Sequence, residues 1–258
     1  MLRPAVRFWL GTHEVSWLSR TDVPLFLSAR RLRLRKSLPK AKGPWALDSG
    51  GFSELSLYGE WRTSAMQYSS EVRHWRSVVG GLEWAAIQDW MCEEAVLKKT
   101  GFSVAEHQRR TVHSYILLRQ LAPDLPWVPV VQGFTLGEYL DCVARYRAEG
   151  VDLSALPLVG LGSICRRQGT AEAERVVRTL AEECGLKIHG FGFKVMGLRR
   201  TTDCLASADS LAWSFEARRG EALPGCSHRN CANCLPYALD WLSRVLAGLH
   251  KPQQLRFA

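Results

Sequence analysis

Residues 127–162, with the sequence WVPVVQGFTLGEYLDCVARYRAEGVDLSALPLVGLG, contain one complete strand–helix–strand unit. The apolar runs at 127–132 and 157–162 predict two buried strands, because strands covered on both faces have nearly continuous apolar sequences. Between them, Thr135 and Glu138 form the capping-box pattern that starts a helix. A strand, a helix and a second strand in this order are typical of a parallel sheet covered by helices.

Short apolar runs of the same kind occur on both sides of this unit. Helices are predicted at 65–79, at 170–184 and from Ser103 onward, where Glu106 repeats the capping-box pattern. Eight strands that alternate with helices in a chain of 258 residues predict one (β/α)8 TIM-type barrel, of the α/β class. The predicted strands are residues 6–11, 24–29, 45–48, 84–89, 127–132, 157–162, 187–193 and 207–213.

The composition is that of a protein with a sizeable core, since 47% of the residues are hydrophobic and 23% are charged. No apolar run reaches about 18 residues, which excludes a conventional membrane span. The first residues, MLRPAVRFWLGTHEV, have only a short apolar segment and no small-residue cleavage site. They predict a first strand and not a signal peptide, so we expect an intracellular protein without a membrane partner.

The chain has a formal net charge of +9, and its basic residues are 26 Arg and 8 Lys. Guanidinium groups present a planar fork of donors to phosphates, so this excess suits a nucleic-acid partner, although a GC-rich genome also favours Arg. A charge run by itself is more often a solvated surface. The candidate nucleic-acid-binding residues are Arg30, Arg31, Arg33, Arg35, Arg166, Arg167, Arg199 and Arg200.

The segment after residue 220 contains a cluster of potential metal ligands. Cys226, His228, Cys231 and Cys234 lie within nine residues of each other. Four such ligands are typical of a closed tetrahedral zinc site, and an intracellular location favours a metal over disulfides. Reduced thiols without a metal are the less favoured alternative. We therefore divide the chain into a barrel at 1–220 and a zinc-binding element with a C-terminal helix at 221–258.

Polar residues and glycine turns follow the predicted strands at their carboxyl ends, where barrels of this kind carry their active sites. Each carboxylate alone could cap a helix, but several at one rim are costly for a purely structural core. A lone histidine on a strand, such as His13 or His189, is more often a core residue. The residues at the rim are Asp48, Asp89, Gln132, Asp209 and the turns Gly160-Leu161-Gly162 and Gly190-Phe191-Gly192.

The sequence resembles the tRNA-guanine transglycosylase family in an ordered set of motifs over most of the chain. Asp48-Ser49-Gly50-Gly51-Phe52 resembles the DSGGF/Y motif of that family, and Val131-Gln132-Gly133 resembles its VQG motif. The glycine turns at 160–162 and 190–192 resemble the turns that follow in the family. Each motif alone has low specificity, but their order and their placement on strands agree as a set.

The resemblance implies a base-exchange enzyme, a pentosyltransferase, in which an Asp attacks C1′ of a guanosine and a 7-deazaguanine then displaces the enzyme. Retention at C1′ requires a nucleophilic carboxylate and a second carboxyl as acid and base, which the motif assigns to Asp48. In the family pattern IDMFDCVLPTR the second Asp is the nucleophile, and Ala212 stands at that position here. Asp209, which matches the first Asp, is our predicted nucleophile, with Asp203 and Glu216 as alternatives.

The same resemblance implies how the base is bound. Asp89 stands where the family binds the guanine edge, and a carboxylate can accept hydrogen bonds from N1–H and the exocyclic amine. Gln132 offers a donor and an acceptor to the O6 side, and the turn at 160–162 lies near the 7-substituent. Glycines after Asp48 let the backbone approach a ligand. The predicted substrate-binding residues are Ser49, Gly50, Asp89, Gln132, Gly160, Leu161 and Gly162.

The family also has a CxCxxC cluster with a distant His, which implies a structural Zn²⁺ here. The distant His would be His250, but a helix at 235–249 would separate it from Cys234 by roughly 22 Å at 1.5 Å per residue. We therefore prefer His228 as the fourth ligand and keep His250 as the alternative.

The polymer partner is DNA or tRNA, and the sequence at 160–167 and 208–214 is more similar to the branch that inserts 7-deazaguanine derivatives such as preQ0 into phage or genomic-island DNA. Family members that act on tRNA are longer. We therefore expect DNA, with tRNA as the alternative, and a cytoplasmic location, which is the host cytoplasm if a phage encodes the protein.

Two other classes of protein compete with this interpretation. An alanine, Ala212, stands at the position of the family nucleophile, so a non-catalytic nucleic-acid-binding subunit remains one alternative. A nucleoside hydrolase is the other. A homodimer is possible.

Overall fold

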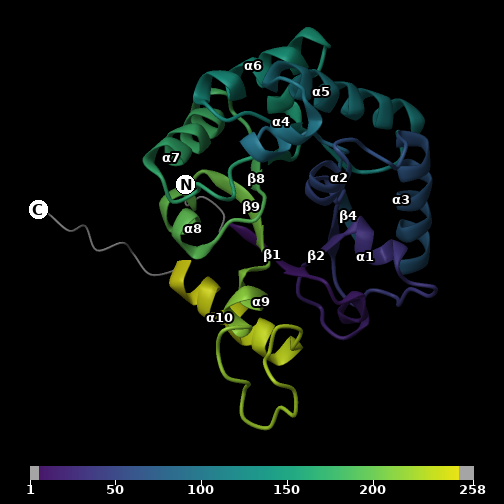
Figure 1. Cartoon of the computed structure of the whole chain (residues 1–258), viewed down its shortest axis with the longest axis vertical. Helices are drawn as coiled ribbons and strands as arrows, with labels where there is room; N and C mark the ends of the chain where they lie inside the picture. Colours follow the sequence, from purple (N-terminus) through teal and green to yellow (C-terminus); the bar gives the residue numbers. More distant parts are fainter. Residues whose placement is uncertain (1–5, 250–258) are drawn as a thin grey trace, which may run out of the picture.

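Parallel strands surrounded by helices form a nearly closed barrel in the computed structural model, which describes residues 6–249 (Figure 1). This confirms the predicted fold class. The order of the strands is β5-β4-β3-β2-β1-β9-β8-β7-β6. Their bounds are β1 (Arg7–Thr12), β2 (Leu25–Ser28), β3 (Trp45–Asp48), β4 (Leu82–Ala86), β5 (Trp127–Val128), β6 (Val130–Val131), β7 (Val159–Leu161), β8 (Ile188–Gly190) and β9 (Leu205–Ser210).

Residues 127–131 close the barrel, and Pro129 divides this segment into two short strands. β5 precedes Pro129 and pairs with β4, whereas β6 follows it and pairs with β7. Proline has no N–H for the strand ladder. The hydroxyl of Tyr146 accepts a hydrogen bond from the Val130 N–H at 3.3 Å and donates to the Val130 carbonyl at 3.0 Å. The single strand predicted at 127–132 is therefore two segments.

The helices lie outside the strands, and Figure 1 shows α3, α5, α6, α7 and α8 around the barrel. Both predicted capping residues accept the expected backbone hydrogen bonds: Ser103 from Glu106, and Thr135 from Glu138 in a complete capping box. The predicted helix at 170–184 is a regular α-helix only to residue 178, and residues 179–183 continue it as one turn of the wider π-helix. The helices are α1 (Ala29–Arg33), α2 (Gly51–Tyr58), α3 (Ala65–Val79), α4 (Glu94–Thr100), α5 (Val104–Leu121), α6 (Leu136–Ala148), α7 (Ala171–Arg178), α8 (Val195–Thr201), α9 (Ala212–Ala217) and α10 (Leu235–Leu249).

Alternate residues of the strands face two separate cores. On β1, Phe8 and Leu10 pack against the helices, whereas Trp9 belongs to a second cluster inside the barrel. That inner cluster contains Trp84, whose ring meets the ring of Trp9 edge to face at 5.6 Å, and Phe26. Aromatic rings therefore fill much of the space between the strands.

The C-terminal part of the described chain packs beside the barrel. Trp241 of α10 lies 6.1 Å from Phe8 of β1 between ring centroids, and its indole N–H donates to Glu216 of α9 at 3.1 Å. The loop that joins α9 to α10 projects away from the barrel in Figure 1, and the proposed division at residue 220 falls within it. No helix within residues 6–249 has the length and apolar character needed to cross a membrane.

The contact between β1 and β9 requires a residue without a side chain at Gly11. A Cβ atom there would lie 2.8 Å from the Ser210 carbonyl oxygen, which is closer than packed atoms allow. Gly11→Ala should therefore lower the free energy of unfolding by about 1–3 kcal/mol, the usual effect of overpacking. Gly137→Ala is the matched control, because nothing lies within 4 Å of that position in α6. It should raise the free energy of unfolding by roughly 0.5–1 kcal/mol. Urea unfolding measures both, and equal midpoints would contradict the prediction.

Candidate active site

Three of the predicted aspartates lie at the carboxyl ends of strands. Asp48 is the last residue of β3, Asp89 follows β4, and Asp209 is the last residue but one of β9. Burial raises the pKa of Asp48, and the charge of Asp209 raises it further. Burial, and next the charge of Asp48, raise the pKa of Asp89 to about 7. Asp48 is therefore close enough to each of the other two carboxylates to interact with it electrostatically.

Asp48 is held by the turn that follows it. Its carboxylate accepts hydrogen bonds from the Gly50 N–H and from the hydroxyl of Ser28, at the end of β2. Gly50 has a φ of 85°, a left-handed conformation that favours glycine, and the chain passes directly into α2. The neighbouring Ser49 is buried, and among residues 6–249 its hydroxyl has no hydrogen-bond partner. This hydroxyl is available to a group from outside the chain.

Asp89 and Gln132 are joined by a hydrogen bond across the rim. Nε2 of Gln132 donates to Oδ2 of Asp89 at 2.5 Å. The hydroxyl of Ser163 donates to Oε1 of Gln132 at 2.6 Å and accepts from the Cys92 N–H at 2.7 Å. These contacts fix which side of the Gln132 amide faces Asp89. The sequence did not identify Ser163, and its place directly after the glycine turn is the one available signal.

Asp209 is held by two groups from β8 and the turn after it. Its Oδ1 accepts a hydrogen bond from the Gly192 N–H at 2.9 Å and lies 3.3 Å from Nε2 of His189. Nδ1 of His189 lies 2.8 Å from the hydroxyl of Ser207. His189 is the register partner of Ser207. One imidazole therefore contacts both Ser207 and Asp209, which face the same side of β9.

His189 is fully buried, as expected of a core residue, but its contact with Asp209 gives it a place in the site. The rings of Trp84 and Phe191 meet the imidazole edge to face, with centroids at 4.6 and 4.7 Å. These rings restrain the imidazole, which in turn restrains one oxygen of Asp209. The other oxygen, Oδ2, has no hydrogen-bond partner in the described residues.

The alternative acids on this part of the chain lie elsewhere. Ala212, at the position of the family nucleophile, begins α9 beyond the end of the strand. Asp203 precedes β9 and forms an ion pair at 2.8 Å with an arginine of α7. Glu216 accepts hydrogen bonds from two side chains of α10. Of these acids, Asp209 is the one whose charge acts on Asp48.

The turn at 160–162 is packed against other side chains of the protein. The ring of Phe191 occupies the space beside Gly160, and the side chain of Gln132 occupies the space beside Gly162. Leu161 is buried in the outer core. In this structure the turn therefore positions Gln132 and Phe191.

The arginines after β2 are distributed around α1. Arg30 lies against the turn at Gly50, where its side chain would contact a Cβ atom. Arg31 is exposed, and its charge contributes to the lowered pKa of His13, for which burial is the main cause. Arg33 is half-buried and forms an ion pair at 2.7 Å with an acid of α3.

The remaining predicted arginines fall on both ends of the barrel, and Arg35 is exposed beyond α1. Arg166 and Arg167 follow β7 and lie at the rim. Arg199 and Arg200 are near the end of α8, which leads to the start of β9, so they lie toward the amino ends of the strands. Arg200 also forms an ion pair at 3.3 Å with an acid of α7. The structure does not bring these two residues to the rim.

The predicted metal ligands come together in the loop between α9 and α10. One potential ligand atom from each of Cys226, His228, Cys231 and Cys234 lies within 4.8 Å of the others. Cys231 Sγ also accepts a hydrogen bond from the Leu223 N–H at 3.2 Å, a contact that suits a thiolate. The donor set fits a tetrahedral metal such as zinc. The alternative ligand, His250, lies outside the described residues.

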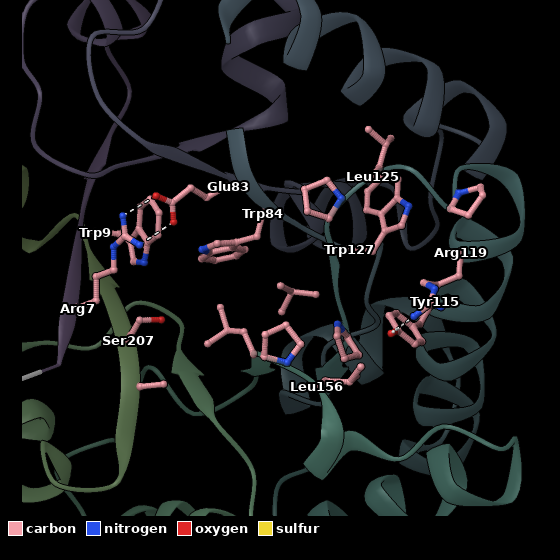
Figure 2. Close-up of a pocket in the computed structure, with 17 residues that line it drawn as sticks. Arg7, Trp9, Glu83, Trp84, Tyr115, Arg119, Leu125, Trp127, Leu156 and Ser207 are labelled. Atoms are coloured by element: carbon pink, nitrogen blue, oxygen red, sulfur yellow. Dashed lines mark hydrogen bonds and ion pairs between the residues drawn. The ribbon is translucent and has the colours of Figure 1, made fainter. Parts of the chain in front are cut away.

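A separate cavity of about 670 Å³ lies near the amino ends of the strands (Figure 2). Prolines and aromatic rings line it, and Arg7 and Glu83 form an ion pair at 2.6 Å along one side. The indole N–H groups of Trp9 and Trp84 have no hydrogen-bond partner among residues 6–249. Of the residues that line it, only Glu83 carries a carboxylate, so this cavity is distinct from the site of the three aspartates.

One protein-family model matches nearly the whole chain. A family model described as "DpdA: DeoxyPurine in DNA protein A" matches residues 5–255. Among curated proteins, none matches the chain. The family match spans the strands, the rim and the cluster of Cys and His. The chain therefore belongs to the DpdA family of DNA 7-deazaguanine transglycosylases, which is related to the tRNA-guanine transglycosylases.

Proposed function

We propose that this protein replaces guanine in DNA with a 7-deazaguanine base such as preQ0, through a covalent intermediate on Asp209. The observation that carries the proposal is the hydrogen bonding of the Asp209 carboxylate. Its Oδ1 is held by the Gly192 N–H and by His189, while its Oδ2 is free of hydrogen bonds within residues 6–249. Two further carboxylates at the same rim favour an enzyme over a non-catalytic subunit, because such a grouping costs folding free energy.

The base enters the site first. The target nucleotide leaves its stack, because C1′ and the base edge are inaccessible within a duplex, at a cost of about a few kcal/mol. Asp89 accepts hydrogen bonds from N1–H and the exocyclic amine of guanine, and Gln132 serves the O6 side. Ser163 supports this role by fixing the orientation of the Gln132 amide.

The glycosidic bond is then exchanged for an ester. Oδ2 of Asp209 attacks C1′ as the bond from C1′ to N9 of guanine breaks, and Asp48 gives its proton to the departing purine. The raised pKa of Asp48, caused mainly by burial, favours the protonated form that this step needs. Guanine leaves as the neutral base and Asp48 remains as a carboxylate.

The second half reverses these steps with a different base. A 7-deazaguanine binds through the same edge to Asp89 and Gln132. Asp48 takes the proton from its N9 position as that nitrogen attacks C1′ and the ester to Asp209 breaks. One pocket serves two purines in turn, which requires ping-pong kinetics.

Substitution of the nucleophile separates binding from chemistry. Asp209→Asn should abolish release of guanine from labelled DNA and change the affinity for DNA by less than about threefold, because the nucleophile contributes to the reaction and little to binding. Asp48→Asn should slow exchange and allow an adduct to accumulate, visible as a gel-shifted species that survives denaturant. Formation of that adduct by Asp209→Asn would place the nucleophile elsewhere.

The raised pKa of Asp89 makes binding of the free base depend on pH. Asp89 must be ionised to accept two hydrogen bonds, so binding of guanine should strengthen as the pH rises through about 7. Asp89→Asn should bind guanine more weakly and without this dependence. Asp124→Asn, at an exposed ion pair with Arg73, is the control and should retain it. Calorimetric titration across this pH range measures all three proteins, and a flat profile for the unaltered protein would refute the assignment.

We also propose that Cys226, His228, Cys231 and Cys234 hold a structural Zn²⁺ ion. Four protein ligands leave no coordination position for water, so the ion would connect α9 to α10 and take no part in the exchange. Cys231 and Cys234 are buried together with Ala217 of α9, which is consistent with this structural role.

Loss of two ligands should remove the metal and weaken the fold. Cys231→Ser/Cys234→Ser should contain no zinc and lose on the order of 3 kcal/mol of unfolding free energy, the value for a ligand at about a hundred times its Kd. Cys184→Ser changes a half-buried thiol outside the cluster and should retain both zinc and stability. Metal analysis with thermal unfolding gives the readout. Full zinc occupancy in the double variant would exclude the site, and unchanged zinc in His228→Ala would point to His250.

A further inference from the structure

Within residues 6–249, every exposed phenylalanine ring is paired with an arginine. Within residues 6–249, the Phe side chains that are more than a third exposed are Phe52, Phe102, Phe134 and Phe215. A guanidinium carbon lies 4.0–5.2 Å from the centroid of each ring. The pairs are Phe52 with Arg166, Phe102 with Arg110, Phe134 with Arg167, and Phe215 with Arg219.

These rings share one end of the barrel. Phe52 is in the first turn of α2 after β3, and Phe134 is in the short loop between β6 and α6. Phe215 is in α9 after β9, and Phe102 immediately precedes α5, whose opposite end leads to β5. All four therefore lie on the side of the strand carboxyl ends, which is the side of the three aspartates.

Two of the pairs form one continuous row. Arg166 and Arg167 are consecutive in the chain, yet Arg166 reaches Phe52 beside β3 while Arg167 reaches Phe134 beside β6. Arg167 also donates a hydrogen bond to the Phe134 carbonyl. We call Phe52, Arg166, Arg167 and Phe134 the ring row. It joins the parts of the rim beside β3, β7 and β6, on the side of the candidate active site.

The ring row has the chemistry of a surface for unpaired nucleotides. An exposed ring gains little from burial within the protein, and a guanidinium over it contributes only about 0.5–1 kcal/mol at an exposed site. Bases stack on such rings whatever their sequence, and guanidinium groups bind the phosphates between them. Arg167 forms an ion pair with Glu172 at 3.3 Å, whereas Arg166 has no carboxylate within ion-pair distance among residues 6–249, so the charge of Arg166 is the one available to a phosphate.

We propose that the ring row binds the unpaired nucleotides next to the target guanine, so that the protein holds DNA as a locally single strand. This deepens the proposed function and rests on it for the position of the target. A duplex does not fit the same role, because each base face inside a duplex is covered by its neighbours and cannot stack on a side chain. The inference therefore concerns several nucleotides, beyond the single extruded one.

The test measures coupling between a ring and a base by fluorescence anisotropy, without any free 7-deazaguanine. The probes are a labelled single strand of thymines with one central guanine, the same strand with abasic sites beside the guanine, and the matching duplex. Phe52→Leu and Phe134→Leu should each weaken binding of the intact single strand by about tenfold, the scale of one base–aromatic stack. Binding of the duplex should change by less than about twofold, since its bases offer no free face.

The abasic strand completes the cycle. It should bind the unaltered protein more weakly than the intact strand does, and Phe52→Leu should then have little further effect, since its partner base is already absent. Phe52→Trp keeps a ring and should bind the intact single strand as the unaltered protein does.

Two further variants serve as a control and as a test of the arginine. Leu121→Ala removes an exposed apolar side chain at the end of α5, away from the rim, and should bind all probes as the unaltered protein does. Arg166→Gln should weaken binding and reduce the salt slope by about one phosphate contact.

Equal binding of the intact strand by Phe52→Leu, Phe134→Leu and the unaltered protein would overturn the inference, as would equal losses for single strand and duplex. The outcome is independent of the exchange reaction. Ring-dependent binding without guanine release would refute the proposed function alone. Guanine release that depends on Asp209, with binding that is insensitive to the rings, would refute the ring row alone.

Discussion

Closure of the barrel at Pro129 is the constraint on which the rim depends. Residues 127–131 pair with β4 on one side and with β7 on the other, so the ends of β4, β6 and β7 are brought together. The chain of hydrogen bonds from Asp89 through Gln132 to Ser163 crosses this junction. An open barrel would leave two strand edges unpaired and would separate these three side chains. The same contacts that complete the fold therefore assemble the part of the site that fits a guanine edge.

Burial and the charge of a neighbouring acid raise the pKa values of Asp48 and Asp89 and so disfavour their ionised forms, and hydrogen-bond donors from neighbouring elements offset part of this effect. Asp48 receives hydrogen bonds from Ser28 and the Gly50 N–H, and Asp89 receives one from Gln132. Both partners of Asp209 engage the same oxygen, Oδ1, and leave Oδ2 without a hydrogen bond among the described residues. A carboxylate that is restrained at one oxygen and free at the other has a defined orientation for attack, whereas a fully bonded one would first lose a hydrogen bond.

The sequence was sufficient for the barrel because strand order and apolar runs are local features, and it placed Asp48, Asp89 and Asp209 at one end because parallel strands share their direction. It could not show that His189 contacts Asp209, or that Ser163 contacts Gln132, since these depend on register between strands. Arg199 and Arg200 illustrate a different limit. Their charge suggested a place at the rim, but residues at the end of a helix that leads into the next strand lie at the opposite end of the barrel.

The buried reactive groups and the exposed aromatic rings both suit DNA in which the target nucleotide has left its stack. Gln132 is fully buried and Asp209 nearly so, and C1′ of a nucleotide can reach Asp209 only if that nucleotide has left its stack. Removal of one nucleotide uncovers the faces of the bases on either side, which then lose stacking free energy. Phe52 and Phe134 present aromatic surface at the same rim. Stacking on these rings would recover part of that loss where the extrusion creates it, so the groups that require an unpaired nucleotide and those that stabilise its neighbours belong to one surface.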